Sequence, residues 1–210
     1  MKNHEQLELT HLHTIVNCDN WWRSANDLMI SADVLKPLAL EFFKDNITED
    51  RKKQCEAHLN TFFLLAAFAL ENALKAYIVR ANRNKIANEI KEKNIFPEII
   101  RGHNLKTLAV AAGIPIPSKA DSEFLIRMSR YAIWAGRYPS ALRPSDTPTQ
   151  LPPFIKVNEG WIATKCYSTA DIRLVETLMT YLEHTWKQER VEPVAPPNPH
   201  SRSVQGAGGC

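Results

Sequence analysis

Cysteine is scarce in this sequence, and its four copies lie far apart. Cys18, Cys55, Cys166 and Cys210 form no C-x-x-C pair, so the spacing indicates neither a zinc ribbon nor a thioredoxin-type redox motif. The first residues, 1–6, are polar and lack the apolar segment of a secretory leader. We therefore expect free thiols in a reducing, cytoplasmic environment.

Long apolar runs and a strong charge of one sign are also missing. The most apolar stretch, residues 61–70, has about half of the roughly 20 residues that a membrane-spanning helix needs, so we predict no membrane span. The net charge is +3 and the pI is near 8.6. Such a mild excess does not indicate a nucleic-acid binder, and a basic site would have to arise from local clustering.

Several common catalytic patterns are absent. The sequence has no G-x-x-x-x-G-K-[ST] phosphate loop, no dinucleotide-binding glycine pattern, no H-E-x-x-H zinc helix and no G-x-S-x-G nucleophile turn. His4, His11 and His13 are close together, but no regularly spaced ligand set accompanies them. We expect neither a metal nor a cofactor. Metal-independent RNA cleavage needs only a base for the 2′-hydroxyl and a cation for the developing charge, so it stays open.

Helical periodicity dominates what is present. Apolar residues recur every three or four positions in several segments, the longest of which runs from Glu49 to about Asn82 behind Thr48 as its N-cap. Because that segment has apolar groups on both sides, we expect it at the centre of a bundle or in a subunit interface. Asp19 is the expected cap of a first helix to about Leu35, and Pro37 could start a short continuation.

Later helix starts follow the same reasoning. Asn104 can cap a short helix from Leu105, Ser118 or Asp121 the next one, and Ser168 or Thr169 the last. Between the last two helices, two short apolar runs joined through residues 158–160 predict a β-hairpin at about 154–165, which we expect to pack on the helices.

The predicted fold class is therefore all-α: an up-and-down helical bundle with a small β-hairpin insertion before the last helix. Residues 1–18 are assigned to an N-terminal extension and residues 19–190 to the bundle. Residues 191–210 are rich in Pro and Gly, so we expect a disordered tail there.

The segment from Phe124 to Pro139 is the first candidate site. If it is one helix, Arg127, Arg130, Trp134 and Arg137 share one arc along about 15 Å. Arginines can bind phosphates in bidentate fashion, and an indole can stack on a base. In the alternative interpretation, the arginines pair with acidic residues of other helices.

Three further sets of residues could have either a functional or a structural role. His103 precedes the helix that Asn104 can cap, where it could meet a ligand or simply bond a carbonyl of the turn. Arg51 and His58 share a helix face but are about 10 Å apart along the axis. Glu71 and Lys75, four residues apart, are interpreted first as a structural helix pair.

Three segments, taken in order, resemble the HEPN family of small helical domains. Residues 68–77 read F-A-L-E-N-A-L-K-A-Y, residues 102–108 read G-H-N-L-K-T-L, and Tyr131 is followed by Arg137-Tyr138-Pro139. Many members have an acidic residue before an Ala-Leu-Lys run, a His-polar-Leu helix start and a terminal Arg-Tyr-Pro. The similarity covers about residues 60–140.

The resemblance implies a helical bundle that dimerises and takes part in RNA processing, toxin–antitoxin pairs or phage defence. Its partners would then include a cognate antitoxin or a nucleotidyltransferase-like protein. Ribonucleases of the family carry an R-x(4–6)-H motif that meets its copy across a dimer. Arg137 is followed by no histidine at that spacing, whereas Arg51 and His58 match it upstream of the Ala-Leu-Lys segment.

Our leading hypothesis is a dimeric, non-catalytic HEPN-like protein that binds RNA, a nucleotide or a partner protein. The ligand-binding candidates are Arg127, Arg130, Trp134, Arg137 and Tyr138. One alternative is a metal-independent endoribonuclease toxin that uses His103 with Arg130 or Arg137, or Arg51 with His58. The other is a purely protein-binding helical dimer.

Overall fold

The computed structural model describes residues 10–93, 95–135, 154–157, 160–163 and 168–191. Residues 10–16 are helical. The elements that follow are α2 (Cys18–Glu41), α3 (Glu49–Lys93), α4 (Glu98–Arg101), α5 (Leu105–Ala111), α6 (Lys119–Arg130), the π-helical η1 (Tyr131–Ala135), β1 (Phe154–Val157), β2 (Gly160–Ala163) and α7 (Thr169–Val191). The predicted all-α class is confirmed.

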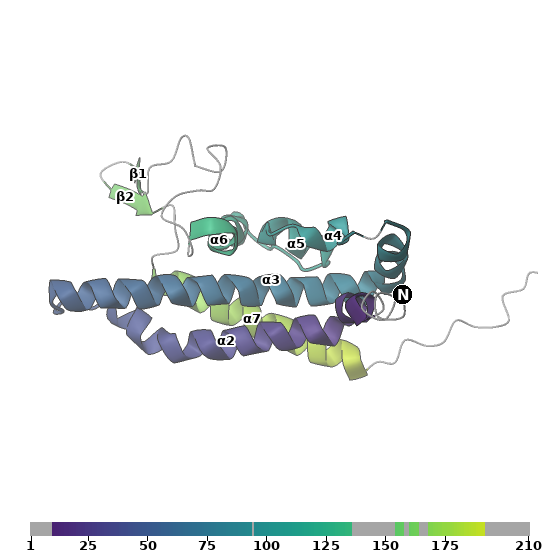
Figure 1. The fold of residues 1–210 in the computed structure, drawn as a ribbon. Coiled ribbons are helices and arrows are strands. Elements are labelled where there is room, and N and C mark those ends of the chain that lie inside the picture. Colours follow the sequence, from purple (N-terminus) through teal and green to yellow (C-terminus); the bar gives the residue numbers. More distant parts are fainter. Residues whose placement is uncertain (1–9, 94, 136–153, 158–159, 164–167, 192–210) are drawn as a thin grey trace, which may run out of the picture.

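The helices form layers around α3. Figure 1 shows α3 in the middle, with α2 and α7 along one side of it and α4, α5 and α6 along the other. The chain direction alternates, since α2 runs opposite to α3, the α4–α6 segment runs back, and α7 runs with α3. α3 therefore has neighbouring helices on two opposite sides.

The central position of α3 follows from its sequence. Its buried residues include Leu59, Ala69, Ile78 and Val79, which lie on different sides of the helix. The backbone N–H of Arg51 donates to the Thr48 hydroxyl at 3.3 Å, which confirms the predicted N-cap.

The first part of this helix ends in a bend at Asn82, close to the predicted end, but the polar segment beyond it is also helical, which the sequence pattern did not predict. The chain bends there, with φ −121° and ψ 21°, and then continues as a helix to Lys93. The Asn82 side chain donates to the Ile78 carbonyl at 2.9 Å, and Ile86 and Ile90 beyond the bend are buried. The apolar face thus extends past the bend at four-residue spacing, and this burial outweighs the polar composition of the segment.

Part of α3 is also long and apolar enough to cross a membrane, as judged from length and composition. The relevant window has a mean hydropathy of 1.6, and 78% of it is buried among the other helices. A buried core helix has the same properties, so this finding carries no membrane assignment.

The first long helix starts and ends elsewhere than expected. Its N-cap is Asn17, whose side chain accepts from the Asp19 N–H at 3.0 Å, so the assignment of the cap to Asp19 is wrong. The helix also does not restart at Pro37 but contains it and continues to Glu41. A proline removes one helical hydrogen bond, and the fully buried Ala32 and Ala39 on either side pack both parts into the core.

A cluster of aromatic rings joins α2, α3 and α7. Trp22 and Trp186 are stacked with ring centroids 4.8 Å apart, and the Tyr77 ring meets both edge-on. The Tyr77 hydroxyl donates to the Leu182 carbonyl at 2.6 Å, and the Arg80 guanidinium lies 3.9 Å from the centre of the Trp186 ring. These contacts fix α7 against the other two helices.

The predicted uninterrupted helix from Phe124 to Pro139 is wrong. The α-helix ends at Arg130, and Tyr131–Ala135 form a π-helical turn. Tyr131 is fully buried, with its ring centroid 5.5 Å from that of Phe63. Hydrogen bonds from i to i+5 widen the turn, so angles computed for a regular α-helix do not apply beyond Arg130. Pro139 lies outside the described residues.

Two short strands occupy part of the predicted hairpin region. Phe154 pairs with Ala163 and Val157 with Gly160 in an antiparallel, two-stranded sheet. Figure 1 places this pair beyond the helical layers, so the expected packing of a hairpin insertion on the bundle is not supported.

The chain before α2 also contributes to the core. Ile15 and Val16 are buried, and the Trp21 indole donates to the Ile15 carbonyl at 2.9 Å. The predicted extension, residues 1–18, thus includes a helical part at 10–16. Residues 1–9 and the expected tail at 192–210 lie outside the described residues.

Truncation of the aromatic cluster should cost much of the stability. Trp186 is 2% exposed, so Trp186→Ala leaves a large cavity and should lower the free energy of unfolding by about 3–5 kcal/mol. Chemical denaturation followed by circular dichroism measures this loss. Thr180→Ala, at an exposed position of α7, serves as the control; equal effects of both changes would contradict the central role of the cluster.

An ion pair at the α2–α3 corner should make stability depend on acid. Arg51 donates to the two Glu41 carboxylate oxygens at 2.6 and 3.3 Å, and this bonding lowers the pKa of Glu41 below its ordinary 4.5. A lowered folded-state pKa adds stability that is present above pH 4.5 and is lost as the pH falls through the folded pKa.

Glu41→Gln should therefore flatten the fall in stability between about pH 6 and pH 3, most clearly at low salt. Denaturation midpoints measured across that range test it. Asp27→Asn, at an exposed carboxylate of α2 for which no ion pair occurs in the described part of the chain, should leave the slope unchanged. The same slope in wild type and Glu41→Gln would refute the expected linkage.

Candidate functional site

The start of α5 positions His103. Gly102 is extended, with φ −68° and ψ 161°, and Asn104 caps α5 by accepting from the Thr107 N–H at 3.1 Å. This confirms the predicted cap. The Leu105 N–H is bound by the Ser129 hydroxyl of α6 at 2.8 Å. The turn that carries His103 is therefore tied to a neighbouring helix as well as to its own cap.

His103 is bound to a buried carboxylate of α3. Its Nδ1 lies 3.0 Å from each carboxylate oxygen of Glu71. The His103 side chain is 52% exposed, whereas the Glu71 side chain is 9% exposed. A carboxylate accepts hydrogen bonds, so Nδ1 donates and Nε2 is the basic atom of the neutral ring. The carboxylate fixes which nitrogen can react outward.

Lys75 forms an ion pair with the same carboxylate. Its Nζ lies 2.6 Å from Oε1 of Glu71, and the Lys75 side chain is 5% exposed. The ammonium group also lies 5.7 Å from the centre of the Trp21 ring. The two charges compensate each other where water is largely excluded, which a buried carboxylate requires. The Glu71–Lys75 pair is thus buried and also holds His103.

This arrangement can perform two chemical tasks. An imidazole oriented by a carboxylate can accept a proton at Nε2, as a general base does. When protonated, the same ring can bind an anion through a charge-assisted hydrogen bond. Arg101 and Lys106, close to His103 in sequence, are exposed and add positive charge around it, although Arg101 also pairs with Glu98 at 3.1 Å.

The two arginines of the proposed strip that the structure describes, Arg127 and Arg130, both have partners. Arg127 donates to the Asp171 carboxylate of α7 at 2.7 Å, and Asp171 is buried. Arg130 is half-buried and also has an interaction partner. For Arg127, the structure therefore favours the alternative interpretation, pairing with an acidic residue of another helix. The α-helix ends at Arg130, so the spacing of a regular α-helix applies only to Arg127 and Arg130 of the strip.

The other members of the strip lie partly or wholly outside the described residues. The backbone of Trp134 lies in η1, but its side chain is outside the described residues. Arg137 and Tyr138, the candidates at the Arg-Tyr-Pro end, also lie outside them. Their roles stay predictions.

The alternative pair, Arg51 and His58, is not brought together with a shared ligand position. Arg51 forms its ion pair with Glu41 and also donates to Gln54 at 3.2 Å. His58 is half-buried two turns further along α3. Arg51 thus serves to join α2 to α3.

Sequence reasoning missed the partners of His103. Glu71 and Lys75 are the only acidic or basic side chains between His58 and Tyr77. Two charges within such an apolar run, on a helix expected to be central, are a signal for a buried pair. The contributions of Trp21 and Ser129 had no comparable signal, because they come from helices remote in sequence.

Among the described residues, no group of three or more His, Cys, Asp or Glu side chains could hold a metal ion. No family model matches the chain, and no curated protein or solved structure matches it either. Function is therefore inferred from the geometry around His103.

The buried pair should behave as a unit. Glu71→Gln or Lys75→Met alone leaves an uncompensated charge at a buried position, so each should cost about 3–5 kcal/mol of unfolding free energy. The double change removes both charges and should cost less than the two single changes together. Denaturation of all four proteins gives the coupling energy. If the costs simply add, the pair is not the buried unit that the geometry indicates.

Proposed function

We propose that this chain is a HEPN-like helical protein whose surface around His103 binds the phosphate of an RNA or a nucleotide without cleaving it. The observation that carries the proposal is the half-exposed His103 ring, bound at Nδ1 by the buried Glu71 carboxylate. When protonated, a ring held in this way presents its Nε2–H as a donor to an incoming phosphate at little entropic cost. The neighbouring Arg101 and Lys106 attract an anion to the same surface.

We favour binding over cleavage because of how a candidate catalytic arginine is paired. Cleavage of this kind needs a cation at the phosphate beside the base. Arg51, one of the cations that the ribonuclease alternative would use, is bound to Glu41. A ribonuclease that uses His103 with Arg130 or Arg137 remains the second candidate, because a carboxylate–imidazole pair is also the arrangement of a general base.

A protein-binding role is the third candidate. Ile30 and Val34, one turn apart on α2, are 65% and 72% exposed. Such a patch is suited to a second copy or to another partner. In the toxin–antitoxin or phage-defence setting that the HEPN resemblance implies, that partner would be an antitoxin or a nucleotidyltransferase-like protein. A cytoplasmic location belongs to the same proposal.

The binding hypothesis can be tested with RNA in EDTA. The full chain should shift labelled single-stranded RNA at low salt, weaken steeply as salt rises and leave the RNA intact. His103→Ala should weaken binding about tenfold, which is the loss of one hydrogen bond to a charged group. Arg137→Ala tests the Arg-Tyr-Pro end in the same way. His184→Ala, an exposed histidine of α7, is the matched control.

The outcomes are distinct. Cleavage that persists in EDTA and disappears in His103→Ala would replace binding with the ribonuclease. If neither RNA nor nucleotides bind at low salt, and light scattering shows a dimer that Ile30→Lys disrupts, the protein-binding candidate is supported instead.

A further inference from the structure

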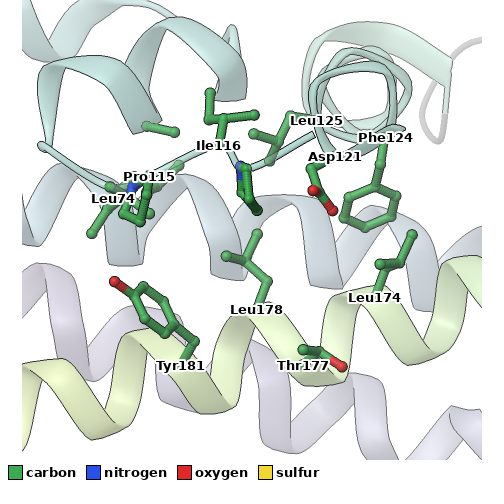
Figure 2. A pocket seen from close by; sticks show the side chains of 13 residues that line it. Leu74, Pro115, Ile116, Asp121, Phe124, Leu125, Leu174, Thr177, Leu178 and Tyr181 are labelled. Carbon is green, nitrogen blue, oxygen red and sulfur yellow. The ribbon is translucent and has the colours of Figure 1, made fainter. Parts of the chain in front are cut away.

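A hollow of about 240 Å³ lies between α6 and α7. Its walls are the loop at residues 114–117, α6 and α7, and Leu74 of α3 also lines it. Figure 2 shows the side chains of Ile116, Phe124 and Leu178 around this space. Apart from a few polar groups, the lining is hydrocarbon, which favours an apolar occupant.

An ion pair and a conformationally restricted loop fix the positions of the walls. At the far end, the Arg127–Asp171 ion pair joins α6 to α7 at 2.7 Å. On the loop side, Gly113 adopts φ 71°, a left-handed conformation that ends α5, and Pro115 and Pro117 restrict the backbone that follows. The hollow is therefore preformed, so little ordering would be needed on binding.

One charged group faces this apolar space. Asp121 is the only charged residue among those that line the hollow, and Figure 2 shows its carboxylate directed toward α7, between Phe124 and Leu178. The Ser118 hydroxyl donates to Oδ2 of Asp121 at 2.6 Å. No other hydrogen bond or ion pair to this carboxylate occurs in the described part of the chain. Oδ1 is thus able to accept from a ligand.

We propose that this hollow is a binding site for small hydrophobic amines, with the alkyl or aryl body between α6 and α7 and the ammonium group at Asp121. The negative charge selects against carboxylates of the same shape, and a neutral alcohol lacks the charge-assisted hydrogen bond. An apolar cavity of about 150 Å³ admits benzene. A volume of about 240 Å³ therefore suits a phenyl group or a chain of roughly six to eight carbons.

Octylamine, octan-1-ol and octanoate form a matched series of probes. Titrated into the full chain below their micelle concentrations, with methyl NMR shifts as the readout, octylamine should bind about tenfold more tightly than octanol, and octanoate most weakly. Asp121→Asn can still accept from Ser118 and should bring octylamine to within about twofold of octanol. Asp27→Asn, on α2, should change nothing.

Leu178→Trp fills the hollow and should weaken octylamine and octanol about tenfold or more. Circular dichroism would check that this variant is folded, and Asp121→Asn tests the proposal independently. Octanoate binding as tightly as octylamine, equal affinities of amine and alcohol in the wild type, or an unchanged amine affinity in Asp121→Asn would each overturn the proposal.

Discussion

The burial of the middle of α3, residues 66–79, on every side is the constraint on which the rest of the structure depends. A helix with an apolar stripe needs one neighbour, but α3 has buried residues around its circumference and needs several. The layers in Figure 1 satisfy this requirement, with α2 and α7 on one side and the α4–α6 segment on the other. The aromatic cluster of Trp22, Tyr77 and Trp186 joins three of these helices. Because α7 is far from α2 and α3 in sequence, the core forms only when these distant segments pack together.

The candidate site is a consequence of the same constraint. Glu71 and Lys75 lie on the buried helix, so their charges must compensate each other, and the carboxylate has capacity left to bind His103. His103 reaches it because the cap at Asn104 and the Ser129 hydroxyl hold the start of α5 against α3 and α6. A single buried carboxylate thus links the interior to a half-exposed ring. The hollow near Asp121 is separate from the site around His103. Its walls depend on a different interaction, the Arg127–Asp171 ion pair between α6 and α7.

Local signals predicted the local features well. Thr48, Asn104, Ser118 and Ser168 all bind N–H groups of their helices as expected, because a cap needs only residues two or three positions away. Predictions were wrong where tertiary packing competes with local preference. Buried Ile86 and Ile90 extend α3 through a polar segment, and buried Ala32 and Ala39 keep α2 helical around Pro37. The π-helical turn after Arg130 had no recognised signal in the sequence.

The sequence by itself determined the helical class, the central place of α3 and the position of His103 immediately before a helix. These follow from periodicity and capping, which act over a few residues. Only the tertiary structure decided that Arg127 would pair with Asp171 and that Arg51 would join Glu41. It alone also decided that Glu71 would hold His103. Those choices depend on which helix faces bury one another, since a charge leaving water takes the nearest partner that the packing brings within hydrogen-bonding distance.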